Sequence, residues 1–153
     1  MDVSAAVLDY VGAQKALTLA TASASGTPHA STFMYVNDGL SLYFWARPSS
    51  ATAEHVRANP RVSFTIDEYV ENWNKAKGIQ GEGECTFVAG DELANVLGLF
   101  GDKFPSPSSG ASTTNISFFK IVPFELHFID NAGSDIHLSE EEFGVDFHRE
   151  KVL

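Results

Sequence analysis

Polar and apolar residues alternate along several short segments in the first half of the chain, which is the pattern of half-buried strands. The segment from Val62 to Ile66 shows it most simply, because its apolar residues alternate with Ser63 and Thr65. The same period recurs before it. The other strands predicted in this half run over 17–22, 29–36 and 40–45.

Turn signals separate these strands and predict how the chain folds back. The run Asn-Asp-Gly at 37–39 tolerates positive φ and predicts a hairpin between the second and third strands. A long strand is expected over about 78–88, where Gly81 and Gly83 indicate a bulge or a close backbone approach. Pro123 is expected to split two closing strands, over 116–122 and 124–129. Six or seven strands with such turns predict a mainly β fold, a closed or partly closed antiparallel barrel with a few short helices.

Three segments have helical rather than strand periodicity. The first runs from about Val3 to Val11. The second covers 51–58 and is closed by Asn59 and Pro60. The third places apolar residues at i, i+3, i+4 and i+7 after an N-cap at Asp91 and should end at Gly101.

The size and composition indicate one folded domain. The chain has 153 residues, 44% of them hydrophobic. We assign residues 1–153 to a single domain, with a core at about 16–129 and a tail at 130–153. No apolar run reaches transmembrane length and the N-terminus lacks a basic signal start, so we expect a soluble, cytoplasmic protein without membrane contact. A single cysteine, Cys85, excludes an internal disulfide and fits a reducing cytosol. The formal charge of −10 argues against a nucleic-acid partner.

The most informative chemistry lies where an aromatic strand leads into a helix start. The strand 42–45 is followed by Ser49, Ser50, Ala51 and Thr52. A helix N-terminus offers free N–H groups and a positive dipole end, which suit an anion such as phosphate, and the aromatic strand suits a flat ring. The histidines lack metal-type spacing and no catalytic arrangement can be inferred, so we predict no metal site and assign no catalytic residue.

The order and spacing of several short motifs resemble the pyridoxamine 5′-phosphate oxidase-like, FMN-binding split-barrel family, and its small single-domain members more than the oxidase itself. The resemblance covers roughly 16–129. The motifs that carry it are Leu19-Ala20-Thr21, Gly26-Thr27-Pro28-His29, Leu42-Tyr43-Phe44, Asn59-Pro60-Arg61-Val62, Trp73 followed by Lys77-Gly78-Ile79-Gln80 with Glu82-Gly83, and Lys120-Ile121-Val122-Pro123.

This resemblance implies a six-stranded split barrel that forms a homodimer, with FMN, or in some members haem or a deazaflavin, at the subunit interface. The flavin ring would lie against the second strand and be flanked by the third, with its phosphate at the helix start. A residue at the position of Gln80 would reach the flavin, in some members from the partner chain. The residues implied are His29, Ala30, Ser31 and Thr32 for the ring, Trp45 and Ala46 beside it, Ser49, Ser50 and Thr52 for the phosphate, and Gln80 for the flavin. To these cofactor-binding residues we add Arg47 and Lys77 as candidate cations and Trp73 as a candidate interface residue.

The chain departs from the oxidase pattern at four cationic positions, which here hold Ser31, Val36, Ala51 and Thr52. A charge-assisted hydrogen bond contributes about 1.5–3 kcal/mol against about 1 for a neutral one, so their loss should weaken phosphate binding. We expect Arg47 to replace them first and Lys77 of the neighbouring chain next. The tail has no evident counterpart of the oxidase's substrate-binding extension, so oxidation of pyridoxamine phosphate itself is not predicted.

Three functions follow from the sequence. The first is a dimeric FMN-binding oxidoreductase that acts on a small substrate. The second, which the missing cations favour, is a non-catalytic binding protein of the same fold for haem, a deazaflavin or another flat anionic ligand. The third is a structural or regulatory dimer with an empty groove.

Overall fold

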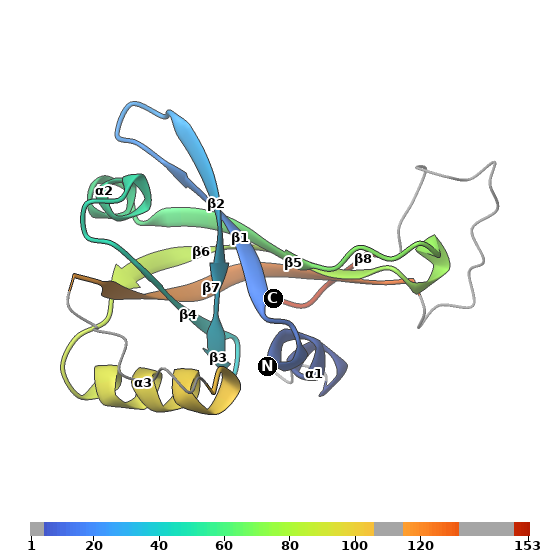
Figure 1. Ribbon diagram of the computed structural model, residues 1–153. Coiled ribbons are helices and arrows are strands. Elements are labelled where there is room, and N and C mark those ends of the chain that lie inside the picture. Colours follow the sequence, from blue (N-terminus) through green and yellow to red (C-terminus); the bar gives the residue numbers. More distant parts are fainter. Residues whose placement is uncertain (1–4, 106–114, 132–148) are drawn as a thin grey trace.

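The computed structural model describes residues 5–105, 115–131 and 149–153. In this part of the chain, eight antiparallel strands form one curled sheet in the order β2-β1-β5-β6-β7-β4-β3, with β8 on the free side of β7 (Figure 1). The strands are β1 (Ala16–Ala22), β2 (Pro28–Met34), β3 (Val36–Asp38), β4 (Ser41–Ala46), β5 (Arg61–Asp67), β6 (Lys77–Phe87), β7 (Ser117–Asp130) and β8 (Arg149–Lys151). The helices are α1 (Ala5–Ala13), α2 (Ala51–Ala58) and α3 (Asp91–Lys103), with one 3₁₀ turn, η1 (Trp73–Lys75).

The sheet curls into a half-barrel that stays open between β2 and β4. The long strand β7 pairs with β6 along most of its length and with β4 over residues 117–121, so it joins the two parts of the sheet. Strands β2 and β4 approach each other but share no ladder among the residues described. The predicted fold class, a mainly β antiparallel split barrel with short helices, is confirmed. Two short strands, β3 and β8, bring the total to eight.

The barrel interior is filled by alternate side chains of the strands and covered at two places by helices. Helix α1 contributes Val7, Tyr10 and Val11 to the core, and α2 contributes Ala53 and Val56. Burial alternates strictly along β5, because its apolar residues point inward and its hydroxyl residues outward, as the sequence predicted. The position of α2 at one end of the barrel matters most, because this helix begins beside the open gap (Figure 1).

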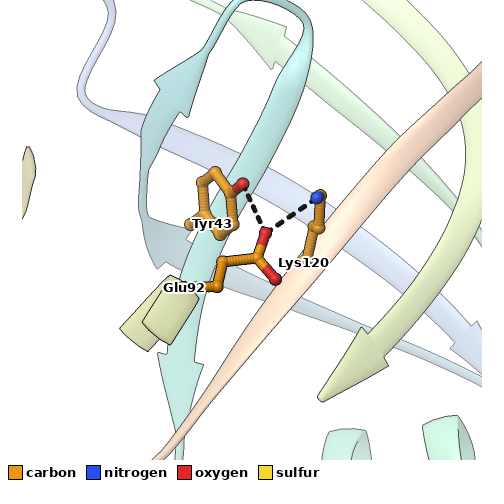
Figure 2. Close-up of polar contacts among 3 residues, drawn as sticks. All are labelled: Tyr43, Glu92 and Lys120. Carbon is orange, nitrogen blue, oxygen red and sulfur yellow. Dashed lines mark hydrogen bonds and ion pairs between the residues drawn. The ribbon is translucent and has the colours of Figure 1, made fainter. Parts of the chain in front are cut away.

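Helix α3 packs on the outside of β3 and β4 over a second apolar cluster around Val96 and Phe118. A polar clamp fixes the start of this helix. Figure 2 shows Glu92 accepting hydrogen bonds from Lys120 of β7 at 2.7 Å and from Tyr43 of β4 at 2.8 Å. These hydrogen bonds, that of Lys120 foremost, hold the pKa of the Glu92 carboxyl below its usual value. The clamp therefore ties α3 to both strands.

The predicted strand over 29–36 is wrong as one element, because it breaks at Tyr35. The Tyr35 side chain is fully buried, its hydroxyl donates to the carbonyl of Val11, and its amide donates to the carbonyl of Lys15. Tyr35 and Val36 are buried in succession, so the alternation stops there. The expected hairpin exists, but it joins β3 to β4, and β2 pairs with β1 instead.

Two predicted boundaries are also wrong. Helix α3 has Gly90 rather than Asp91 as its N-cap, with φ of 65°, and it passes Gly101 to end at Lys103. The two closing strands are one strand, β7, which continues through Pro123. The proline lies opposite Gly83 where the β6–β7 register shifts, and a bulge of this kind tolerates a residue that cannot donate a ladder bond.

Cys85 is a small buried residue of β6, as interpreted from the sequence, and burial raises the pKa of its thiol to about 12. Most of the tail assigned to 130–153 lies outside the described residues, of which it keeps only 130–131 and 149–153. Among the residues described, no helix has both the length and the apolar character needed to cross a bilayer.

Candidate functional site

A groove of about 450 Å³ lies in the open side of the half-barrel, between β2, β4 and the start of α2. Its volume is within the range of roughly 300–1,000 Å³ that is usual for small-molecule sites. The structure thus brings together nine of the thirteen residues that the sequence nominated for a cofactor. The lining comprises His29, Ser31, Thr32, Phe33, Met34, Trp45, Ala46, Arg47, Ser49, Ser50 and Thr52.

The groove differs in charge from the rest of the molecule. The chain has 20 acidic and 10 basic residues, but no acidic residue of the described part of the chain lines the groove. The ionisable side chains of this lining are the basic ones of Arg47 and His29, and four of its five hydroxyl residues belong to β2 or to the segment at 49–50. A concave surface of this composition favours an anion by charge and by hydrogen bonding.

The start of α2 lies at the groove and has a well-formed N-cap. Ser50 is the N-cap and its hydroxyl accepts from the amide of Ala53 at 3.1 Å. A tight turn precedes it, in which the Ser50 amide donates to the carbonyl of Arg47 at 3.0 Å. The cap uses the amide of the third helical residue, and the amides of Ala51 and Thr52, in the first helical turn, have no acceptor within the helix and lie at the positive end of its dipole.

Arg57 of α2 supports this turn from behind. Its Nη2 donates to the carbonyl of Pro48 at 3.0 Å, and its guanidinium lies over the ring of Phe87 at 5.3 Å. Since Pro48 lies between Arg47 and Ser49, the contact fixes the segment that carries the cation and the first hydroxyl of the groove.

A chain of polar side chains runs along the end of the groove near α2. His29 Nε2 and Ser31 Oγ are 2.9 Å apart on β2. The His29 ring meets the ring of His55 edge-on, with centroids 5.8 Å apart and planes at 88°. His55 Nδ1 in turn is 2.9 Å from the hydroxyl of Thr21 on β1. Thr21 is buried and His55 is half-buried, so this hydrogen bond is partly shielded from water.

The opposite end of the groove is apolar. The ring of Phe33 packs against that of the core residue Phe44, with centroids 4.7 Å apart and planes tilted by 35°. Trp45 and Met34 keep 38% and 49% of their surface exposed, although both are large and apolar. An exposed pair of this kind at the rim of a concavity is typical of a surface that a ligand or a second subunit covers.

Four nominated residues lie outside this groove. Ala30 is exposed on β2 and does not line the groove. Trp73, Lys77 and Gln80 line a separate hollow of about 390 Å³ at the connection between β5 and β6. That connection, green in Figure 1, lies at the other end of the molecule from α2.

Sequence reasoning missed four residues that belong to the groove or its support. Phe33 and Met34 were not nominated, although the alternation along β2 placed Phe33 on one face with His29. His55 and Thr21 were not nominated for the site, because their hydrogen bond joins segments far apart in the sequence.

The ionisable residues that the structure describes outside the groove include a close His–Glu pair. Within residues 5–105, 115–131 and 149–153, no group of three His, Cys, Asp or Glu side chains is arranged to hold a metal ion. A shallow hollow of about 300 Å³ on the outer face of β1, β5, β6 and β7 contains Glu125 and His127, whose Oε1 and Nδ1 atoms are 3.7 Å apart.

A curled antiparallel half-barrel with a groove along its open side defines the chain as a small split-barrel protein. The family model of pyridoxamine 5′-phosphate oxidase matches residues 3–130. Because the match covers most of the chain, the chain belongs to the pyridoxamine 5′-phosphate oxidase family. Comparison with curated proteins finds no match.

The solved structures with the same fold include a haem storage protein and a haem-binding protein. HutZ, the haem storage protein from Vibrio cholerae, is 22% identical, with a TM-score of 0.69 over 82% of this chain and 94% of HutZ. A haem-binding protein from Mycobacterium smegmatis is 17% identical, with a TM-score of 0.71 over 88% of this chain and 57% of that protein. The conserved hypothetical protein Rv2991 from Mycobacterium tuberculosis is 22% identical, with a TM-score of 0.75 over 91% and 92%. At these low sequence identities, the likeness to these structures shows the fold alone.

Proposed function

We propose that the groove between β2, β4 and α2 binds FMN, and that the chain is a flavin-dependent oxidoreductase acting on a small substrate. The observation that carries the proposal is the charge of the groove: its described lining has cations and hydroxyls and no acidic residue, in a chain of formal charge −10. The phosphate would lie at the start of α2, beside Arg47, Ser49 and Ser50. The ring would lie along β2, with Trp45 at its edge.

The groove residues fit a flat ring with an anionic end. The polar end has hydrogen-bond donors from hydroxyls, from one guanidinium and from the free amides at the start of α2. The apolar end has Phe33, Met34 and Trp45, which suit an aromatic surface. When bound, a flavin supplies hydride or single-electron transfer. This chain's own residues would hold the phosphate, orient the ring and exclude water from one of its faces.

We further propose that two copies of the chain complete the site. The hollow that holds Trp73, Lys77 and Gln80 is at the far end of the same molecule, so only another copy could bring these residues to the groove. Trp73 is 43% exposed and Tyr69 beside it is 84% exposed, which is costly for aromatic side chains unless a partner covers them. Lys77 would then add a cation to the groove of its partner.

A second function, storage or transfer of haem or of another flat anionic ligand such as a deazaflavin, is favoured by a different observation. Two structural neighbours carry haem in their descriptions, and His29 lines the groove. In this case the carboxylates of haem would take the place of the phosphate, and the protein would have no reaction of its own.

Absorbance spectra of the purified protein, recorded with and without added FMN or haemin, distinguish these functions. A flavin spectrum that stays with the protein through gel filtration supports the first, and a Soret band supports the second. A protein that retains neither ligand contradicts both. Molar mass measured by light scattering tests the dimer.

Arg47→Ala tests the position of the anion. The change removes the guanidinium of the groove and, with it, a charge-assisted hydrogen bond of about 1.5–3 kcal/mol, so the Kd for FMN should rise at least about tenfold. Arg61→Ala is the matched control, because Arg61 is exposed on β5 and lies over Phe124, outside the groove. If both substitutions raised the Kd equally, or if neither changed it, Arg47 would not belong to the site.

A further inference from the structure

The hollow at the connection between β5 and β6 has the opposite chemistry to the groove. Its lining has the acidic residues Asp67 and Glu68 against one basic residue, Lys77, whereas the described lining of the groove has no acidic residue. Two large aromatic residues, Tyr69 and Trp73, also line the hollow and are exposed there. Its volume of about 390 Å³ is within the range usual for small-molecule sites.

The floor of the hollow is shaped by a missing side chain. Gly78 of β6 pairs with Asp67 of β5 on one side and with Ile129 of β7 on the other, and all three residues line the hollow. A Cβ atom built on Gly78 would be 3.4 Å from the carbonyl oxygen of Ile66 and 3.6 Å from Asp67 Cβ, which is ordinary van der Waals contact. Gly78→Ala is therefore accommodated, and its methyl group takes up part of the floor.

The backbone that carries the aromatic wall is held in place by hydrogen bonds. Asn131, which is buried, donates from Nδ2 to the carbonyl of Trp73 and from its amide to the carbonyl of Ala76, both at 3.0 Å. The hydroxyl of Tyr10 donates to the carbonyl of Lys77, also at 3.0 Å. Because this backbone is already fixed, a ligand needs to order less of the chain when it binds.

The two carboxylates make the hollow electrically negative. Burial first, and then the charges of Glu68 and Asp67, raise the pKa of Tyr10 to about 12. Neither carboxylate has an ion-pair partner within residues 5–105, 115–131 and 149–153. Carboxylates attract a cation by charge, and the faces of tyrosine and tryptophan rings attract it through their π-electrons. Charge and aromatic surface therefore favour the same kind of ligand.

We propose that this hollow binds a small organic cation with an apolar body, and that such cations are the substrate class of the proposed reaction. The second half rests on the proposed function, because two copies arranged as proposed bring the hollow of one copy beside the cofactor in the groove of the other. The cationic group would lie between the carboxylates and the aromatic rings, and the apolar body against Val70 and Ile129.

Three probes with one body and different charges test the hollow: 2-phenylethylammonium, 2-phenylethanol and phenylacetate. Trp45→Phe leaves Trp73 as the only tryptophan, so its fluorescence reports binding at the hollow in the flavin-free protein. We expect the Kd of the ammonium probe to be at least about tenfold lower than that of the alcohol, with phenylacetate the weakest ligand.

Asp67→Asn combined with Glu68→Gln should abolish this charge preference and leave the Kd of the alcohol unchanged. Asp67→Asn alone should give a smaller loss, which keeps the test valid if the double variant does not fold. Glu71→Gln is the matched control, since Glu71 is exposed in the same connection but does not line the hollow. Gly78→Ala should raise the Kd of all three probes by a similar factor, because it removes space and not charge.

The outcomes separate this inference from the proposal beneath it. If the three probes bind alike, or if the charge preference survives in the double variant, the hollow is not a cation site. In the wild-type protein with FMN bound, saturation with the ammonium probe should shift the flavin absorbance, and the absence of a shift would refute the substrate class. If FMN does not bind, the proposed function and the substrate class fail together, whereas the cation site is still decided by the flavin-free titrations.

Discussion

Gly81 of β6 lies directly opposite Phe64 of β5, and the ring of Phe64 covers the place where a side chain would be. A Cβ atom built on Gly81 would be 2.3 Å from Phe64 Cζ and 2.6 Å from Cε1, well inside van der Waals contact. Phe64 is 3% exposed and belongs to the main core. The ring can leave this place only by displacing other core side chains. Gly81→Ala should therefore be a severe substitution for a single methyl group.

Overpacking of a filled core costs typically about 1–3 kcal/mol, and the depth of this overlap places Gly81→Ala near the upper end. For a chain of this length, 1 kcal/mol corresponds to about 2–4 °C, so the Tm should fall by about 6–12 °C. Because the overlap lies between β5 and β6, the substitution should also lower the affinity of any ligand that needs these two strands in register.

Gly98→Ala provides the matched control. Gly98 is in the middle of α3, its φ is in the ordinary helical region, and a methyl group added to it would meet nothing within 4 Å. Alanine is favoured over glycine in a helix by about 1 kcal/mol, so the same substitution should raise the Tm by about 2–4 °C. Opposite signs for one chemical change isolate the effect of packing.

Equilibrium unfolding in urea, followed by circular dichroism, measures both variants. The slope m should stay constant while the midpoint moves down for Gly81→Ala and up for Gly98→Ala. If Gly81→Ala were as stable as the wild type within about 0.5 kcal/mol, the close packing of Phe64 on β6 would be refuted.

Two further predictions concern single cations. The ammonium of Lys103 lies 4.2 Å from the ring centre of Tyr35, is buried and has no hydrogen-bond partner among the residues described. Lys103→Met removes this buried charge, so the variant should be about 1 kcal/mol more stable at neutral pH. Burial lowers the pKa of Lys103 from 10.5 to about 8, so between pH 8 and 10.5 the unfolded chain binds more protons than the folded one and the wild type becomes more stable as pH rises. The stability advantage of Lys103→Met should therefore shrink over this range, which urea unfolding at several pH values measures. A stability difference that stays constant with pH would contradict the prediction. Arg57→Ala removes the hydrogen bond to the carbonyl of Pro48 and should raise the Kd for FMN about threefold, less than Arg47→Ala does. If Arg57→Ala raised the Kd more than Arg47→Ala, Arg57 would contact the ligand directly and its supporting role would be refuted.

The elements that the sequence predicted well are those with local signals. Helix α2 has the bounds expected for it, because Ser50 caps its start and Asn59-Pro60 follows its end. The alternation in β5 likewise reports burial directly. The break at Tyr35 could not be predicted, because it depends on a hydrogen bond to Val11, in a helix that packs there only in the finished fold.

The candidate groove was predictable in part for the same reason. Most of its lining comes from two continuous segments, 29–34 and 45–52, so spacing along the chain was informative. Pro123 was misread because its tolerance depends on a register shift opposite Gly83, in another strand. The partnership of His55 with Thr21 is of the same kind. The features that could not be predicted from the sequence are therefore those that depend on contacts between segments far apart in the chain.

The central place of β7 has a consequence for how the protein is made. Strands β2 and β4, which form the two walls of the groove, are synthesised early. β4 pairs with the adjacent β3 in a hairpin, but its other pairing partner is β7, near the end of the folded core. Pairings between such distant segments form slowly, and until they form, a nascent chain exposes unpaired strand edges. During synthesis, the two walls of the groove therefore reach their final spacing only after β7 has paired with β4, and a ligand can bind the groove only after that step.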